Sequence, residues 1–285
     1  MARRQTPPTV RRRRLAGELR RLRTAVGLTM RDVAGQTGIN EATLHRIETA
    51  RARPQKRTLV ALLDLYQVTG ELREDLLEIS RGADHQGWLR PYHSELPEDY
   101  TAYISFEAES RSVRSYQSLV IPGLLQTEDY ARALFKAGFP MADSEEVDRR
   151  VRARMERQSL LQQDDPLQLW AIVDEAAFRR QVGGCGVMRA QARHLETITE
   201  APHVTLQVIP FGNGAYAGLA AGAFAHLEFP NPADPELVYI ETMAGDLFLE
   251  SELDIRRYKL LFEHLRASAL STDETAQLLA TVSQT

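Results

Sequence analysis

Apolar residues recur at helical spacing through the first part of the chain, with short polar breaks between the runs. Leu15, Leu19 and Leu22 fall on one face of a helix, and Gly27 ends that run. Similar short runs and breaks continue to Ser80. The pattern predicts five short helices over residues 15–80.

Two of these predicted helices have well-marked ends. Thr29 is suited to cap a helix over residues 30–36, because its hydroxyl can accept an otherwise unpaired backbone N–H. Gly38 follows where a tight turn needs a left-handed residue, and Asn40 can cap a second helix over residues 41–49. A short helix, a glycine turn and another short helix together form a helix-turn-helix.

The second helix of this motif has two distinct faces. At 100° per residue, Leu44 and Ile47 lie within about 60° of each other and are expected in the core. The opposite face carries Ala42, His45, Arg46 and Thr49. Such a helix enters the major groove of DNA with its N-terminal residues at the base edges.

The exposed residue types suit base recognition. Arg46 can donate two hydrogen bonds to guanine, Glu41 can accept one from cytosine, and Ala42 can pack on a thymine methyl group. His45 lies on the same face. Phosphate contacts, which fix register and not sequence, are expected from Arg31, Asn40, Thr43, Arg51, Arg53 and Lys56.

The pattern changes after Ser80. Helices are expected over residues 98–116, 127–137, 144–161, 187–200, 252–270 and 272–282. Short apolar runs at 167–174, 204–211, 222–229, 237–242 and 247–251 predict strands. The long helical segment between the first two strands implies a parallel pair, and the close spacing of the others implies antiparallel pairing. We expect an α+β domain with a mixed sheet of about five strands.

The chain is therefore expected to be multidomain, with an all-α helix-turn-helix domain before an α+β domain. The boundaries predicted are a basic arm at 1–14, the helical domain at 15–80, a linker at 81–97 and the α+β domain at 98–285.

Charge follows the same division. Residues 1–60 contain fifteen Lys and Arg against four Asp and Glu, a balance of +11. The other 225 residues carry 20 basic and 35 acidic side chains, or −15, so the net charge of −4 is an average of two unlike parts. A basic module that binds a polyanion, joined to a body that does not, fits this asymmetry.

Other classes of protein fit the sequence poorly. The only cysteine, Cys185, allows no internal disulfide, and a role as a redox sensor lacks a resolving cysteine. Residues 204–225 carry no charge, but their glycines favour strands and a loop over a membrane span. The glycine run 212–217 precedes another predicted strand, whereas a dinucleotide fingerprint must open a helix. His194 and His203 lack metal-ligand spacing with any other His or Cys, so we expect no metal. We also expect no cofactor and no enzymatic activity.

Two resemblances to known families add to these expectations. Residues 29–34, 38–40, 44–48 and 52–54 resemble the helix-turn-helix of phage-repressor and xenobiotic-response-element regulators, over about sixty residues. The resemblance implies that Glu41, Ala42 and Arg46 read DNA, and that Arg23 and Glu48 form a structural ion pair. The chain departs from the family at Met30, where a glutamine that contacts DNA is common.

The second resemblance lies in the body. Residues 120–132, 204–211 and 238–241 resemble the uncharacterised C-terminal domain of WhiJ-like actinobacterial regulators. That family implies transcriptional control, often with a small BldB-like partner protein in antitoxin-like pairs.

The sequence as a whole predicts a cytoplasmic, sequence-specific DNA-binding regulator, acting as a repressor or antitoxin-like factor. One small helix-turn-helix offers few base contacts, so we expect a homodimer that binds two half-sites of double-stranded DNA. The body would supply the dimer contact, a partner surface or an effector site. Two alternatives stay open: a protein-interaction module with residual non-specific DNA binding, and an enzyme that uses the α+β body.

Overall fold

The computed structural model describes residues 10–81, 96–232, 234–242 and 245–284. Contacts between residues divide the chain into two compact units, with the division between Phe106 and Glu107. Residues 231–235 cluster with the first unit. Most of the predicted arm (1–14) and of the predicted linker (81–97) lies outside the described residues.

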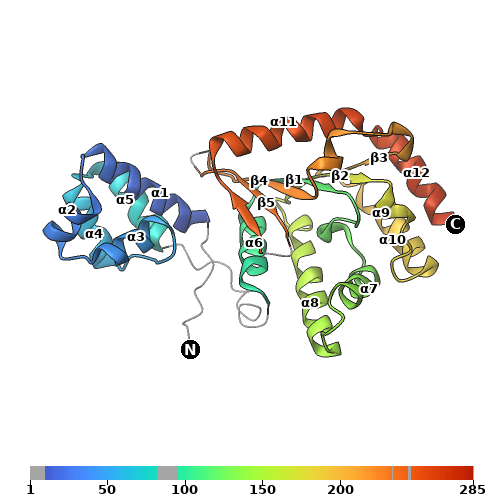
Figure 1. Cartoon of the computed structure of the whole chain (residues 1–285), viewed down its shortest axis with the longest axis horizontal. Helices are drawn as coiled ribbons and strands as arrows, with labels where there is room; N and C mark the ends of the chain where they lie inside the picture. Colours follow the sequence, from blue (N-terminus) through green and yellow to red (C-terminus); the bar gives the residue numbers. More distant parts are fainter. Residues whose placement is uncertain (1–9, 82–95, 233, 243–244, 285) are drawn as a thin grey trace. The chain divides into compact units, whose positions relative to one another are not determined.

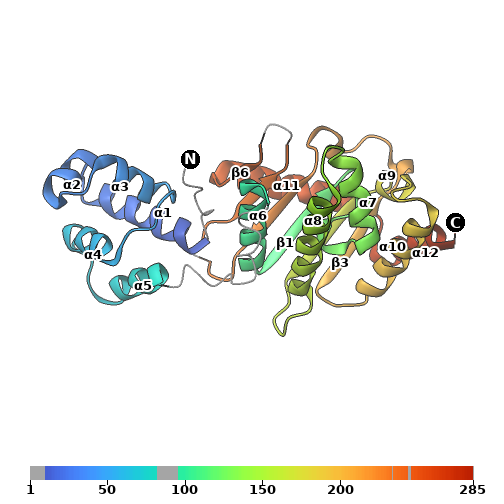
Figure 2. The same ribbon diagram turned by 90° about the horizontal axis from the view of Figure 1, so that it is seen from below.

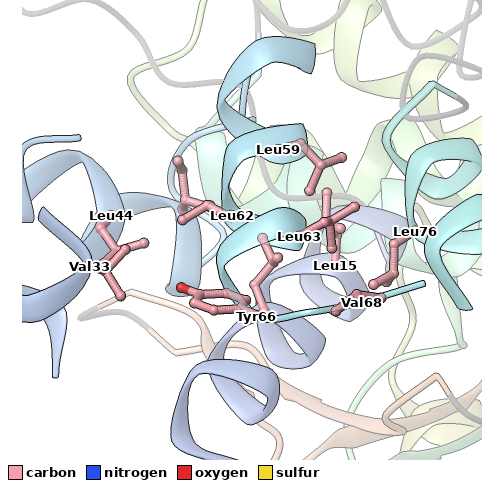
Figure 3. Close-up of a cluster of buried hydrophobic side chains, with 11 residues drawn as sticks. Leu15, Val33, Leu44, Leu59, Leu62, Leu63, Tyr66, Val68 and Leu76 are labelled. Carbon is pink, nitrogen blue, oxygen red and sulfur yellow. The ribbon is translucent and has the colours of Figure 1, made fainter. Parts of the chain in front are cut away.

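The first unit contains a bundle of short helices, as its sequence predicts (Figure 1). They are α1 (Val10–Ala25), α2 (Met30–Thr37), α3 (Glu41–Glu48), α4 (Lys56–Leu65) and α5 (Gly70–Arg81). Their apolar faces meet in one core, in which Leu44 of α3 and Leu62 and Leu63 of α4 are fully buried (Figure 3). This core holds α2 and α3 in place, because each helix alone is too short to be stable in water.

The first helix begins earlier than the sequence predicts. It starts at Val10, so Arg11, Arg12, Arg13 and Arg14 form its first turns and are not part of an arm. Strong helix propensity of arginine explains the extension, because nothing in this run breaks a helix.

The second unit is built on a mixed six-stranded sheet in the order β3-β2-β1-β4-β5-β6. The strands are β1 (Ser112–Gln117), β2 (Gln168–Asp174), β3 (Val204–Ile209), β4 (Phe224–Glu228), β5 (Leu237–Ile240) and β6 (Leu247–Leu249). β1, β2 and β3 are parallel, whereas β4, β5 and β6 add antiparallel pairs. The α+β class, the parallel β2–β3 pair and the antiparallel hairpins are therefore confirmed.

One predicted element is wrong. The helix expected over residues 98–116 ends at Glu109 as α6 (Glu98–Glu109), and β1 follows it. β1 lies between β2 and β4, which makes it a central strand and raises the sheet from about five strands to six. Its polar residues conceal it, since Arg114 is compensated by Glu228 on β4, a partner that only the tertiary fold supplies.

Helices cover both faces of this sheet (Figures 1 and 2). α11 (Glu252–Ser268) lies along one face, where Ile255, Phe262 and Leu265 join Tyr116 and Phe224 in a buried cluster. α7 (Glu128–Gly138) and α8 (Ser144–Arg157) lie on the other face. The remaining helices are α9 (Ala176–Arg179), α10 (Cys185–Ile198) and α12 (Thr272–Gln284).

The uncharged stretch at 204–225 forms β3, two short 3-10 helices and the start of β4. Among the described residues, none of the helices combines the length and apolar character that a membrane crossing requires.

Candidate nucleic-acid interface

The turn between α2 and α3 is fixed by local hydrogen bonds. Thr29 and Asp32 form a reciprocal capping box at the start of α2: the Asp32 N–H donates to the Thr29 hydroxyl, and the Thr29 N–H donates to the Asp32 carboxylate. Gly38 closes α2 with a left-handed backbone at φ +71°, which a side chain would strain. Asn40 then accepts the Ala42 N–H at 2.8 Å and starts α3.

This geometry separates the two faces of α3 as the sequence predicts. Leu44 and Ile47 are buried in the helical core. The predicted base-reading residues Glu41, Ala42, His45 and Arg46 are all exposed, and so is Thr43. The four residues therefore share one solvent-facing surface on a single helix.

Cations without partners surround this surface. Arg31 on α2, Arg46 on α3, Arg51 in the following loop, and Lys56 and Arg57 on α4 are exposed. Within the described part of the chain, none of these five side chains takes part in a hydrogen bond or an ion pair. Free, solvated cations of this kind can neutralise the charges of a polyanion, which then releases its own counterions.

The N-terminus of α4 adds a backbone contribution. Its N-cap residue, Gln55, makes no side-chain hydrogen bond to the helix, so the first N–H groups of α4 stay available. Lys56 follows directly, and a hollow of 380 Å³ opens beside it, lined by Arg53, Pro54, Gln55, Lys56, Leu59, Leu77 and Ser80. A helix N-terminus beside a lysine favours a phosphate group.

Arg53 differs from the other predicted phosphate contacts. Its Nη2 donates a hydrogen bond to the Ser80 carbonyl at the end of α5, which ties the α3–α4 loop to the last helix of the bundle. The side chain stays exposed, but part of its hydrogen-bonding capacity is already used. We therefore assign it to positioning this loop.

The expected ion pair between Arg23 and Glu48 is present. Nε and Nη2 of Arg23 donate to the two Glu48 oxygens at 2.7 and 2.9 Å, and Nη1 donates to the Leu28 carbonyl. The Glu48 side chain is only 1% exposed, so the pair connects α1 to the end of α3 inside the bundle. Its neighbour Tyr66 has its pKa raised to about 12, chiefly because the ring is buried and secondarily because of the Glu48 charge.

Sequence reasoning missed two features of this surface. Arg57 is not among the predicted phosphate contacts, although it lies one residue after Lys56 in the first turn of α4 and is exposed. Met30 is half-buried and packs against the helical core, which gives this position a structural role.

Polar groups of the second unit mostly satisfy one another. The Tyr216 hydroxyl donates to Asp174 and lies 2.7 Å from the Tyr116 hydroxyl; burial and the Asp174 hydrogen bond raise the pKa of Tyr216. Glu175 accepts from Arg179 and from the Phe211 N–H.

The glycine run 212–217 forms parts of 3-10 helices and a turn, so it does not open the helix that a dinucleotide pyrophosphate needs.

One cluster has metal-ligating residue types. His226, Glu228 and Glu236 bring one ligand atom each within 4.8 Å of one another. The Lys259 ammonium lies 2.6 Å from Glu236 and 4.0 Å from Glu228, and Arg114 lies 3.5 Å from Glu228. Arg111 lies 3.8 Å from Glu228 as well, so three cations face the two carboxylates and their charge disfavours a divalent ion there. Burial lowers the pKa of His226, and its Nε2 lies 2.8 Å from Glu236.

The bundle and its exposed surface define the class of protein: a helix-turn-helix protein of the DNA-binding, regulatory kind. A helix-turn-helix domain family model matches residues 14–76. The family model described as a domain of unknown function (DUF5753) matches residues 100–281, more than half of the chain, and the protein belongs to that family. No curated protein and no solved structure matches the chain.

Proposed function

We propose that this protein is a sequence-specific regulator of transcription in which α3 lies in the major groove of DNA. The exposed face of α3 carries the proposal, because Ala42, His45 and Arg46 are presented together by a helix capped at its N-terminus. The unpaired cations on α2, α4 and the α3–α4 loop flank that face, where phosphates of the same groove would lie.

The finer proposal concerns how the whole chain acts. We propose a cytoplasmic homodimeric repressor or antitoxin-like factor, as in the WhiJ-like regulators that its sequence resembles. The body, in which residues 98–285 carry 17 basic and 28 acidic side chains and a balance of −11, would contact itself, a small BldB-like partner or an effector, and not DNA. We propose no catalytic role for the body, since the carboxylates of Asp174, Glu175 and Glu236 are each engaged by neighbouring side chains.

Selection of binding sites from random double-stranded DNA with the full chain tests this function. The expected result is a two-fold symmetric site whose half-sites lie one helical turn apart, about 34–36 Å, or a multiple of it. Arg46→Ala should relax the selection at the base pair that Arg46 contacts, and Arg193→Ala, an exposed arginine on α10, is the matched control.

Two other experimental results would favour the alternative functions. Equal binding to all sequences would contradict base reading and favour an interaction module with residual DNA binding. Turnover of a small molecule by the purified chain would favour an enzyme.

A further inference from the structure

α11 carries apolar residues on the face that points away from the sheet. Ile255, Phe262 and Leu265 are buried against the sheet, whereas Leu253 and Leu260 are 77% and 61% exposed. Leu253 and Leu260 are seven residues apart, so they lie two turns apart on one face. Ala267, a further seven residues along, continues this row and is exposed. We call Leu253, Leu260 and Ala267 the outer row of α11.

Ionic residues flank the outer row in an order that suits a second copy of the same helix. At 100° per residue from Leu260, Arg256 and Glu263 fall on one flank at similar distances before and after it. A two-fold axis between antiparallel helices places such residues opposite each other. With Leu260 at the axis, Arg256 of each copy meets Glu263 of the other.

The same register matches the apolar residues. Leu260 meets Leu260 of the second copy, and Leu253 meets Ala267, so a large residue faces a small one twice. Moving the axis midway between Leu253 and Leu260 would place Arg256 against Arg256 and Arg257 against Arg257. Like charges at that distance repel, which selects the register centred on Leu260.

The ion pairs within α11 do not prevent Arg256 and Glu263 from pairing with a second copy. Arg256 lies 3.1 Å from Glu252, and Glu263 lies 2.7 Å from Arg266, in pairs of exposed side chains within one helix. Such exposed pairs contribute little to stability, so their members can take new partners at low cost. Among the described residues Arg257, on the other flank, has no ion-pair partner and would lie near His264 of the second copy.

We propose that α11 is the dimerisation helix of this protein and binds a second copy of itself, antiparallel and centred on Leu260. This inference deepens the proposed function, because it assigns the surface that brings two helix-turn-helix domains to two half-sites. Its chemistry is an apolar row with one Arg256–Glu263 ion pair on each side of the axis.

Sedimentation equilibrium of the full chain, without DNA and over a wide range of concentrations, tests the interface. We expect the native chain to dimerise and Leu260→Glu to be monomeric, because two carboxylates would meet at the axis. Met141→Glu is the matched control: Met141 is 97% exposed in the α7–α8 turn, on the opposite side of the sheet, and this variant should still dimerise. Circular dichroism checks that each variant is folded.

Charge exchange provides the sharper test of register. Arg256→Glu alone should weaken the dimer at least tenfold, because it faces Glu263 twice. Arg256→Glu combined with Glu263→Arg should restore dimerisation, which a merely structural effect of Arg256 would not allow. A native chain that stays monomeric, a dimer indifferent to Leu260→Glu, or a double variant without recovery would each overturn the proposal. Base reading by α3 is tested separately, because a chain that does not dimerise through α11 can still select a single half-site, whereas a dimer that selects no DNA sequence would overturn the proposed function.

Discussion

At the scale of single residues, the ion pair between Arg23 and Glu48 makes the helix-turn-helix bundle sensitive to the loss of either partner, because the pair is buried. Both Glu48 oxygens are held by one guanidinium, and the Glu48 side chain is almost fully buried. Glu48→Ala leaves the Arg23 charge without its carboxylate, so we expect the free energy of unfolding of the first unit to fall by about 3 kcal/mol. Hydrogen exchange at the amides of α1 and α3 measures that unit on its own.

A matched control for this prediction lies on α1, the helix that carries Arg23. Glu18 forms an ion pair with Arg21 at 2.8 Å, but this pair is exposed to solvent. Glu18→Ala should therefore leave the exchange of α1 and α3 nearly unchanged. Equal losses in the two variants would contradict the role assigned to burial.

Asp32 makes the start of α2 sensitive to acid. The Thr29 hydroxyl and the Thr29 N–H both donate to its carboxylate and lower the pKa of Asp32. Because the folded pKa is below the unfolded one, the contribution to stability is present above the unfolded pKa and is lost as pH falls through the folded pKa. Carboxyl NMR titration should show the lowered pKa, and Thr29→Ala should raise it towards the ordinary value. An unchanged pKa in Thr29→Ala would show that the cap is not its cause.

At the scale of elements, the helix-turn-helix could be predicted almost completely, whereas β1 could not. The caps at Thr29 and Asn40 and the turn at Gly38 are local features, since each acts within four residues. β1 is different, because its strand partners are β2 and β4, and Glu228 lies 116 residues after Ser112 in the sequence. A strand stabilised by such distant partners has a weak local pattern, and its charged Arg114 favours a solvated helix when seen alone.

The connection between α6 and α8 is another element that sequence alone does not reveal. Arg157 near the end of α8 donates to both oxygens of Glu107 on α6 at 2.7 and 2.8 Å, and both side chains are buried. Glu107→Ala should lower the free energy of unfolding of the second unit by about 3–5 kcal/mol, because a guanidinium is left buried without its carboxylate. Glu107→Ala with Arg157→Met should recover part of the loss.

Tryptophan fluorescence can follow this unit. Trp170 packs against the cluster beneath α11, and the chain has one further tryptophan, Trp88, which can be replaced by phenylalanine in all variants. Glu145→Ala serves as the control, since the Glu145 side chain is 80% exposed in its pair with Arg149. No recovery in the double variant would mean that Arg157 stabilises the unit through contacts other than its charge.

At the scale of the whole molecule, the sequence already shows a charge of +11 over residues 1–60 and of −15 over residues 61–285. Whether the basic segment can bind DNA depends, however, on which of its cations are free. In the second unit many arginines are paired, as Arg132 is with Glu128 and Arg157 with Glu107. Around α3 the cations Arg31, Arg46 and Lys56 are exposed and unpaired among the described residues. Pairing depends on the fold, so the sequence could locate the basic unit and not its available charges.

These free cations predict a steep dependence of DNA binding on salt. Each phosphate that a Lys or Arg neutralises should add about 0.9 to the slope of log K against log salt concentration, taken as a magnitude. Lys56→Ala should therefore reduce that magnitude by about 0.9 per protomer, or about two for a dimer on both half-sites, and weaken binding similarly for all sequences. Arg46→Ala should instead cost about 1–3 kcal/mol at the selected site, because it removes a contact to a base. Fluorescence anisotropy over a salt series measures both quantities, with Arg193→Ala as the unchanged control. A slope that Lys56→Ala does not alter would show that Lys56 does not neutralise a phosphate.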